Sequence, residues 1–439
     1  MGLIVGIGTG RGGSGLFPPD YYYGVQWDIT NSSPTLTRIG RAELHQTLPI
    51  HNLMKGCLLL DTGVVNYYLK ADDWTKKADG TAAVLDGSDG QVMIEIPKHY
   101  RKFETDGNIR RAMISQFEIS GFHEVPLCYV SAYEAAVNRT APIKLWSIKN
   151  AAAEYRGGNN TSAWDAAVNS LLGKPATSIS RTNFRAYARA RAAGTKWNMY
   201  TYDIHKAILW LFTIEYATKN SQLAVNAALD ANGYKQGGLG AGVSTAVDAE
   251  WNTFSSYNPF INCGATDGLG NYSGEVSVVM TDFGGAGVNR TFTANRYRGI
   301  ENPFGHIWKN SDGVNVKIQA ADAGAESQLW VATNPADFSD SVYTNYQNRG
   351  LLARASGYAS RFLFGTLGEV APSIASGGSS TYWCDYFYTS IPASGESLRT
   401  LIWGGNATYG ALAGLANAHS NYAPASASTA IGSRLCYLP

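Results

Sequence analysis

The chain has 439 residues, of which 45% are hydrophobic, so it is long and apolar enough to bury a large core. Charged residues make up 16% and the net charge is +1, which excludes a basic field able to hold nucleic acid or an anionic membrane by charge alone. Because no run of about 18 apolar residues occurs, we expect no membrane insertion.

The cysteines are odd in number and far apart in the sequence, so their spacing indicates neither a zinc site nor a disulfide framework. We expect mostly buried free thiols, at Cys57, Cys128, Cys263, Cys384 and Cys436. The N-terminus lacks the basic and apolar segments of a secretion signal. A protein of this kind that works outside a cell would get there as part of a particle or after lysis.

Residues 1–22 are glycine-rich and are expected to form an attachment segment. The glycines at residues 8–13 formally match a dinucleotide-binding pattern. However, Pro18 and Pro19 would stop the helix whose N-terminus must hold the pyrophosphate. We therefore predict no nucleotide site there.

Residues 23–90 are predicted to form a small β-rich region. Short apolar runs begin at Cys57 and Val64, and a third follows at Gln91, with Gly, Asp and Asn turns between them. Beyond about residue 90 we expect a single large domain, 91–439, in which long loops alternate with short strands.

Two helices are predicted in the large domain. The first runs over 181–191 behind the cap residue Ser180, and the second over 204–218 behind Asp203. In the second, apolar residues recur at helical spacing, so we interpret Trp210, Phe212 and Tyr216 as core residues. His306 has no second ligand at metal spacing, so it is interpreted as a hydrogen-bonded structural histidine.

The segment 404–430 has an unusual composition. It contains nine alanines and no charged residue, with Tyr, His, Ser, Thr and Asn between the small residues. Its glycines disfavour a helix and its alanines a sheet, so its backbone must be held by its surroundings. It also lacks Lys, Glu, Gln, Met and Trp, the residues that an asparagine codon cannot reach when only its two adenines are randomised. Tyrosine with small polar residues is typical of binding surfaces.

The end of the chain, residues 397–406 with Ala423-Pro424 and 431–436, resembles that of the variable proteins of diversity-generating retroelements. The runs 214–218 and 305–309 are similar to two motifs of the formylglycine-generating enzyme family, whose C-type-lectin-like fold those variable proteins share. Residues 24–28 and 91–97 resemble segments of phage tail proteins that carry such domains. The resemblance implies an α+β, C-type-lectin-like fold of the formylglycine-generating enzyme type, with a variable region at about 379–439.

In such proteins the diversified positions derive from template asparagines. Carried over to this sequence, the resemblance implies these ligand-binding residues: Asn406, Thr408, Tyr409, Leu412, Ala416, Asn417, His419, Tyr422, Ser426, Ser428 and Ala430. It implies a fixed scaffold at Gly404, Gly405, Pro424, Gly432 and Arg434. Two further aromatic residues, Tyr382 and Trp383, either flank the site or pack in the core.

The function that the resemblance implies is non-enzymatic receptor binding in a virion, at the tip of a phage tail, with no cofactor and no metal. The expected partner is a bacterial surface protein or a glycan. Because single sites of this kind are weak, we expect a homo-oligomer, with a trimer as one possible form.

Three other functions compete with this prediction. An oxidase of the formylglycine-generating type needs a thiol pair for copper, and the positions near Tyr409 and Gly414 hold no cysteine. A calcium-dependent lectin needs carboxylates, which the segment 404–430 lacks. A general phage structural adhesin with no receptor role would leave the composition of that segment unexplained.

Overall fold

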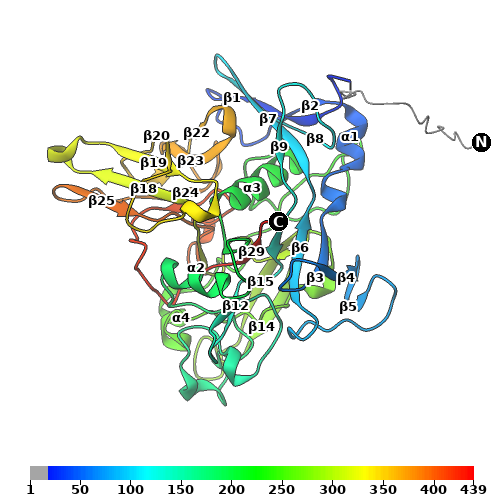
Figure 1. The fold of residues 1–439 in the computed structure, drawn as a ribbon, viewed down its shortest axis with the longest axis vertical. Helices are drawn as coiled ribbons and strands as arrows, with labels where there is room; N and C mark the ends of the chain where they lie inside the picture. The colour runs from blue at the N-terminus through cyan, green and yellow to red at the C-terminus, as the bar shows by residue number, and fades with distance from the viewer. Residues whose placement is uncertain (1–17) are drawn as a thin grey trace, which may run out of the picture.

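The computed structural model describes residues 18–439, so the predicted attachment segment lies outside the described residues except for 18–22. The described chain combines several β-sheets with a few helices (Figure 1), which confirms the α+β class. Within this part of the chain, no helix is both long and apolar enough to cross a bilayer.

Two large sheets contain the N-terminal strands. The five-stranded sheet has the order β2 (Thr37–Gly40), β1 (Tyr23–Asp28), β8 (Ile109–Ser115), β7 (His99–Asp106) and β9 (His123–Val125). The seven-stranded sheet has the order β13 (Trp197–Met199), β29 (Leu435–Tyr437), β10 (Cys128–Ser131), β6 (Gln91–Ile96), β3 (Lys55–Leu59), β4 (Val65–Lys70) and β5 (Asp73–Lys77).

Both sheets cross the boundary that the sequence suggested at residue 90. Strand β1 pairs with β8 and strand β3 pairs with β6, so strands from 23–90 lie beside strands from later in the chain. Residues 23–90 contain the strands β1 to β5, and these strands belong to the two large sheets. The runs expected near Cys57, Val64 and Gln91 are observed as β3, β4 and β6.

The later part of the chain forms smaller sheets. A six-stranded sheet has the order β21 (Gly357–Tyr358), β24 (Tyr386–Tyr388), β27 (Ala418–His419), β26 (Ile402–Trp403), β17 (Trp308–Asn310) and β28 (Ile431–Gly432). A four-stranded sheet has the order β20 (Gln347–Leu351), β19 (Ser327–Val331), β18 (Val314–Gln319) and β25 (Glu396–Arg399), and it projects to the left of the body in Figure 1. The remaining strands pair as β11 (Ala136–Asn138) with β12 (Lys144–Trp146), β14 (Gly274–Met280) with β15 (Arg290–Tyr297) and β16 (Ile300–Glu301), and β22 (Arg361–Phe364) with β23 (Glu369–Ile374).

The two predicted helices are present. Helix α2 (Arg181–Arg189) begins where expected, because the Ser180 hydroxyl accepts a hydrogen bond from the Asn183 N–H. Helix α3 (Tyr202–Tyr216) begins two residues earlier than predicted. Its cap is Thr201, whose side chain accepts from the Ile204 N–H, so the prediction of Asp203 as the cap is wrong. The short helices α1 (Ala42–Thr47) and α4 (Asp248–Ser255) were not predicted.

Helix α3 runs through the main core. Trp210, Phe212 and Tyr216 are buried, which confirms their interpretation as core residues. The Trp210 indole packs 5.2 Å from the Phe103 ring of the five-stranded sheet, measured between ring centroids. Its N–H donates to the Gly368 carbonyl at 2.7 Å, so the buried polar atom has a partner.

Two further predictions on single residues are confirmed. All five cysteines are buried and free. His306 is fully buried, its Nδ1 lies 2.5 Å from Glu134 Oε2, and its Nε2 accepts from the backbone N–H groups of Phe260 and Ile261. A ring with both nitrogens engaged in this way is structural.

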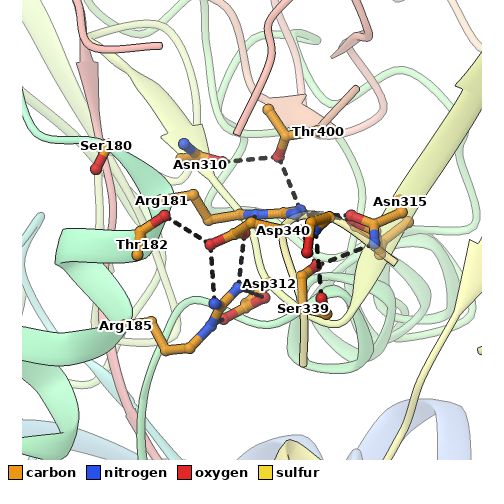
Figure 2. A network of polar contacts seen from close by, with 12 residues as sticks. Ser180, Arg181, Thr182, Arg185, Asn310, Asp312, Asn315, Ser339, Asp340 and Thr400 are labelled. Carbon is orange, nitrogen blue, oxygen red and sulfur yellow. Dashed lines mark hydrogen bonds and ion pairs between the residues drawn. The ribbon is translucent and has the colours of Figure 1, made fainter. Parts of the chain in front are cut away.

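A buried polar network fixes α2 against the strands beside it (Figure 2). The Arg181 guanidinium has no exposed surface, and it donates to Asp340 Oδ1 at 2.6 Å and to Asn315 Oδ1 at 2.7 Å. One turn later, Arg185 binds both Asp340 and the buried Asp312. Burial acts to raise the pKa of Asp340, but the charges and hydrogen bonds of Arg181 and Arg185 outweigh it and lower that pKa to about 2.

We predict that Asp340→Ala destabilises the protein strongly. The substitution leaves the Arg181 and Arg185 charges buried without their shared partner, and losing one member of a buried pair costs about 3–5 kcal/mol. Denaturant unfolding of the two proteins measures the loss. Asp337→Ala in the same loop is the control and is expected to cost less than about 1 kcal/mol. Equal losses in the two variants would contradict the prediction.

Candidate functional site

The segment 404–430 is built around three short strands of the six-stranded sheet. Strand β26 pairs antiparallel with β27, and β28 pairs parallel with β17. Between these strands the chain forms two loops, 404–417 and 420–430. The sheet therefore fixes both ends of each loop.

Hydrogen bonds from other parts of the chain hold the loop backbones. Backbone groups outside the segment bond to it as follows: Ala246 N–H to the Ala407 carbonyl at 2.7 Å, the Ser244 carbonyl to Gly410 N–H at 2.8 Å, Arg181 N–H to the Pro424 carbonyl at 3.0 Å, Ser178 N–H to the Ser428 carbonyl at 2.9 Å, and Trp308 N–H to the Ala430 carbonyl at 2.9 Å. The expectation that the surroundings hold this backbone is confirmed. Side chains on it can change without removing these bonds.

Gly414 and the buried Asp385 make a close contact within the loop 404–417. A Cβ atom on Gly414 would lie 2.1 Å from Asp385 Oδ1, and the Gly414 φ angle of +146° is one that L side chains rarely adopt. Asp385 Oδ2 accepts the Ala416 N–H at 2.6 Å. Burial raises the pKa of Asp385 well above its ordinary value, which favours a neutral carboxyl group there.

The predicted ligand-binding residues divide by exposure. Seven are partly exposed: Asn406, Thr408, Tyr409, Leu412, Tyr422, Ser426 and Ser428. Four are buried: Ala416, Asn417, His419 and Ala430. We leave Ala416, Asn417 and Ala430 out of the candidate surface, because Ala416 and Asn417 are 2% and 0% exposed and Ala430 packs in an apolar cluster with Ala407. His419 is 7% exposed but lies directly under the partly exposed rings.

These rings form a continuous aromatic strip. We define the strip as Tyr358, Tyr386, Tyr388, Tyr409, His419 and Tyr422. Ring centroids lie 5.1 Å apart for Tyr358 and Tyr386, 4.5 Å for Tyr386 and Tyr388, and 5.3 Å for Tyr388 and Tyr409. His419 stacks on Tyr388 at 5.0 Å and lies 4.8 Å from Tyr422. The strip thus joins residues of the segment 404–430 to residues outside that segment.

The buried Trp308 supports the strip from below. Its ring meets Tyr409 edge-on at 5.1 Å and His419 edge-on at 5.3 Å. Such contacts fix ring positions in addition to the area they bury. The strip is therefore held before any ligand arrives.

The strip carries no net charge at neutral pH. Burial raises the pKa of Tyr409 to about 12 and also raises those of Tyr388 and Tyr422, so the hydroxyls stay protonated. Burial lowers the pKa of His419 to about 3, which keeps its ring neutral. The hydroxyls can donate and accept hydrogen bonds, and the ring faces offer apolar area.

Sequence reasoning missed the part of the strip that lies before residue 400. Tyr386 and Tyr388 flank the buried Phe387 on β24, and this alternation on a strand is the signal that could have found them. Instead, Tyr382 and Trp383 were considered as flanking aromatics. Trp383 is buried and stacks on Phe362 at 3.9 Å, so it belongs to the core. The partly buried Tyr382 packs against the same core cluster.

The described part of the chain contains no group of three or more His, Cys, Asp or Glu side chains placed to hold a metal ion. The strip itself offers rings, hydroxyls and backbone groups. These groups can pack against an uncharged ligand surface and form hydrogen bonds with it.

Comparisons with known proteins give little similarity. No family model and no curated protein matches the chain. Among solved structures, PvdO from Pseudomonas aeruginosa matches with 13% identity and a TM-score of 0.31, over 81% of this chain and 98% of that one. A likeness at that TM-score assigns neither a fold family nor a function.

We predict that Gly414→Ala destabilises the protein by roughly 3 kcal/mol, because the new methyl group must displace the Asp385 carboxyl group. Gly410→Ala is the matched control. Gly410 also has a positive φ of +49°, but a Cβ atom there meets nothing within 4 Å, so only about 1 kcal/mol is expected from backbone strain. Thermal unfolding of both variants measures the two losses of stability. A Gly410 variant as unstable as the Gly414 variant would contradict the prediction that the clash with Asp385 causes the loss.

Proposed function

We propose that this protein is a non-enzymatic ligand-binding protein that displays diversified side chains on a fixed scaffold. The observation that carries the proposal is the combination of partly exposed, uncharged side chains with a backbone that the rest of the chain holds in place. A preformed surface loses little conformational entropy on binding. Different side-chain sets on one such backbone can therefore bind different ligands.

We further propose a C-type-lectin-like fold of the formylglycine-generating enzyme type and membership of the variable proteins of diversity-generating retroelements. The sequence motifs at 397–406 and 431–436 support this assignment. So does the buried Arg434, which was expected to be scaffold and which donates to the carbonyls of Ser131 and Asn302.

The ligand would bind across the aromatic strip. Tyrosine rings supply wide contact area at low entropic cost, and their neutral hydroxyls supply hydrogen bonds. Tyr409 and Tyr422 would change between variants, whereas Tyr386 and Tyr388 would stay constant. The constant rings would provide a base affinity and the changing residues the specificity.

An oxidase of the formylglycine-generating type is a weaker candidate. A cysteine at position 414 would place its Cβ atom against the Asp385 carboxyl group, where a Cβ atom comes within 2.1 Å. The five cysteine thiols of the chain all lie outside the segment 404–430 and are buried. These features favour binding over copper-thiolate chemistry at this segment.

The proposed setting is the tip of a phage tail, and the proposed partner is a surface protein or glycan of the bacterial host. A homo-oligomer, such as a trimer, would present several strips at once. Several weak sites on one particle bind much more tightly than one site, because the later contacts form within the same complex.

We predict that replacing Tyr388, Tyr409 and Tyr422 together by serine reduces binding to host cells by at least about tenfold while the fold persists. The measurement is the fluorescence that the labelled full chain leaves on a panel of bacterial isolates, alongside its melting temperature. Tyr272→Ser is the control, since Tyr272 is 56% exposed and lies outside the strip. Lost stability with unchanged cell binding would mean that the rings serve packing alone.

We also predict a genetic record of diversification. A near-copy of the 3′ coding region should lie beside a reverse transcriptase gene, with adenines at the codons of the seven partly exposed positions. The codons of Ala416 and Asn417 should agree in both copies, because their side chains are buried. Sequencing the neighbouring DNA tests this. Absence of any such repeat would reduce the proposal to a general phage adhesin.

A further inference from the structure

A cavity lies between the five-stranded sheet and the beginning of α3. None of its lining residues belongs to the aromatic strip. Its volume is about 370 Å³, within the range of small-molecule pockets. Strands β7 and β9, the first turns of α3 and the loop 332–338 contribute to its wall. It brings together parts of the chain that lie far apart in the sequence.

Much of this wall is apolar. The side chains that matter for a ligand body are Leu127, Ile204, Ala207, Phe338 and Leu367. Ile204, Ala207 and Phe338 are buried, so they form a fixed surface. An apolar group of a ligand would be buried against this preformed wall, and removing its surface from water would favour binding.

Three cations line the same cavity, and two of them have partners. Lys206 Nζ lies 3.2 Å from Asp203 Oδ1 and 3.4 Å from Glu369 Oε2. Arg349 Nε lies 3.5 Å from Glu369 Oε1. Two carboxylates therefore serve these two cations.

Arg101 is the third cation, and it is unmatched. Within residues 18–439 its guanidinium makes no hydrogen bond and no ion pair, and its ring contact is with Phe103 at 5.8 Å. The other two carboxylates of the wall are engaged elsewhere, Asp312 with Arg185 and Glu124 with Lys98. Among the cations of the wall, Arg101 is therefore the one that no side-chain carboxylate of residues 18–439 meets within ion-pair distance.

A guanidinium is always charged and presents its N–H donors as a planar fork. Arg101 is partly exposed, and within residues 18–439 no acceptor of the protein binds its guanidinium, so its N–H donors are available to a ligand. A carboxylate can accept two parallel N–H bonds from the fork, which is among the strongest pairings available to it. One anionic group can therefore bind the Arg101 N–H donors that the protein leaves without an acceptor.

We propose that this cavity binds a small molecule with a single anionic group, best a carboxylate, on an apolar body. Arg101 binds the anionic group, and the wall around Phe338 and Leu367 contacts the body. The site is separate from the proposed display surface and does not depend on that function. Lys206 and Arg349 stay paired with the carboxylates of the protein.

The test uses the full chain with octanoate as the probe and octanamide as its uncharged counterpart. We expect millimolar octanoate to raise the melting temperature and octanamide to have little effect. In Arg101→Met, which keeps the aliphatic stem, calorimetric titration should show octanoate binding at least about tenfold weaker. Lys102→Met on the same strand is the matched control and should bind octanoate like the unchanged protein.

Arg101→Met also reports on folding. Because Arg101 has no partner, this variant should melt no lower than the unchanged protein when octanoate is absent. The proposal is overturned if octanoate binds nowhere on the unchanged chain, if octanamide stabilises it equally, or if Arg101→Met binds octanoate as well as Lys102→Met does.

Discussion

The hydrogen bonds that fix the backbone of 404–430 from outside are the constraint on which the candidate site depends. This segment has a composition that favours neither helix nor sheet, so its own residues cannot determine its shape. Backbone groups near Ser244, Arg181 and Trp308 provide the missing partners. Since main-chain atoms make these bonds, most side chains of the segment have no part in holding it.

Because main-chain bonds hold the segment 404–430, the buried network around Arg181 also affects the candidate surface, although its side chains do not reach that surface. Arg181 donates its backbone N–H to the Pro424 carbonyl, while its side chain binds Asp340 and Asn315. One residue thus links the beginning of α2, the strands below and the second loop of the segment. The position of that loop follows from interactions made well inside the molecule.

The sequence predicted those elements whose signals lie in neighbouring residues, and it did not predict contacts between distant residues. The cap at Ser180 and the apolar spacing of α3 are local, and both helices were found. The choice between Thr201 and Asp203 as the cap of α3 depends on backbone angles that composition does not reveal. The pairing of β1 with β8 joins distant residues and has no sequence signature.

The candidate site shows the same limit. Composition located the segment 404–430, but burial within it depends on how its two loops pack against the rest of the chain. Asn417 and Tyr409 look equally suitable as binding residues in the sequence, yet Asn417 is buried and donates to the Leu412 carbonyl. Trp308 and Tyr388 reach the site from other strands, so only the tertiary fold could place them there.

The location of β29 affects how the protein is made. This strand, residues Leu435–Tyr437, lies between β13 and β10 in the seven-stranded sheet, and it follows the segment 404–430 in the chain. A ribosome must therefore read through every codon of that segment before the sheet can close. A frameshift or stop within 404–430 leaves β10 and β13 as unpaired edges, which exposes the product to aggregation and degradation. Completion of the seven-stranded sheet therefore depends on an intact reading frame through the segment 404–430.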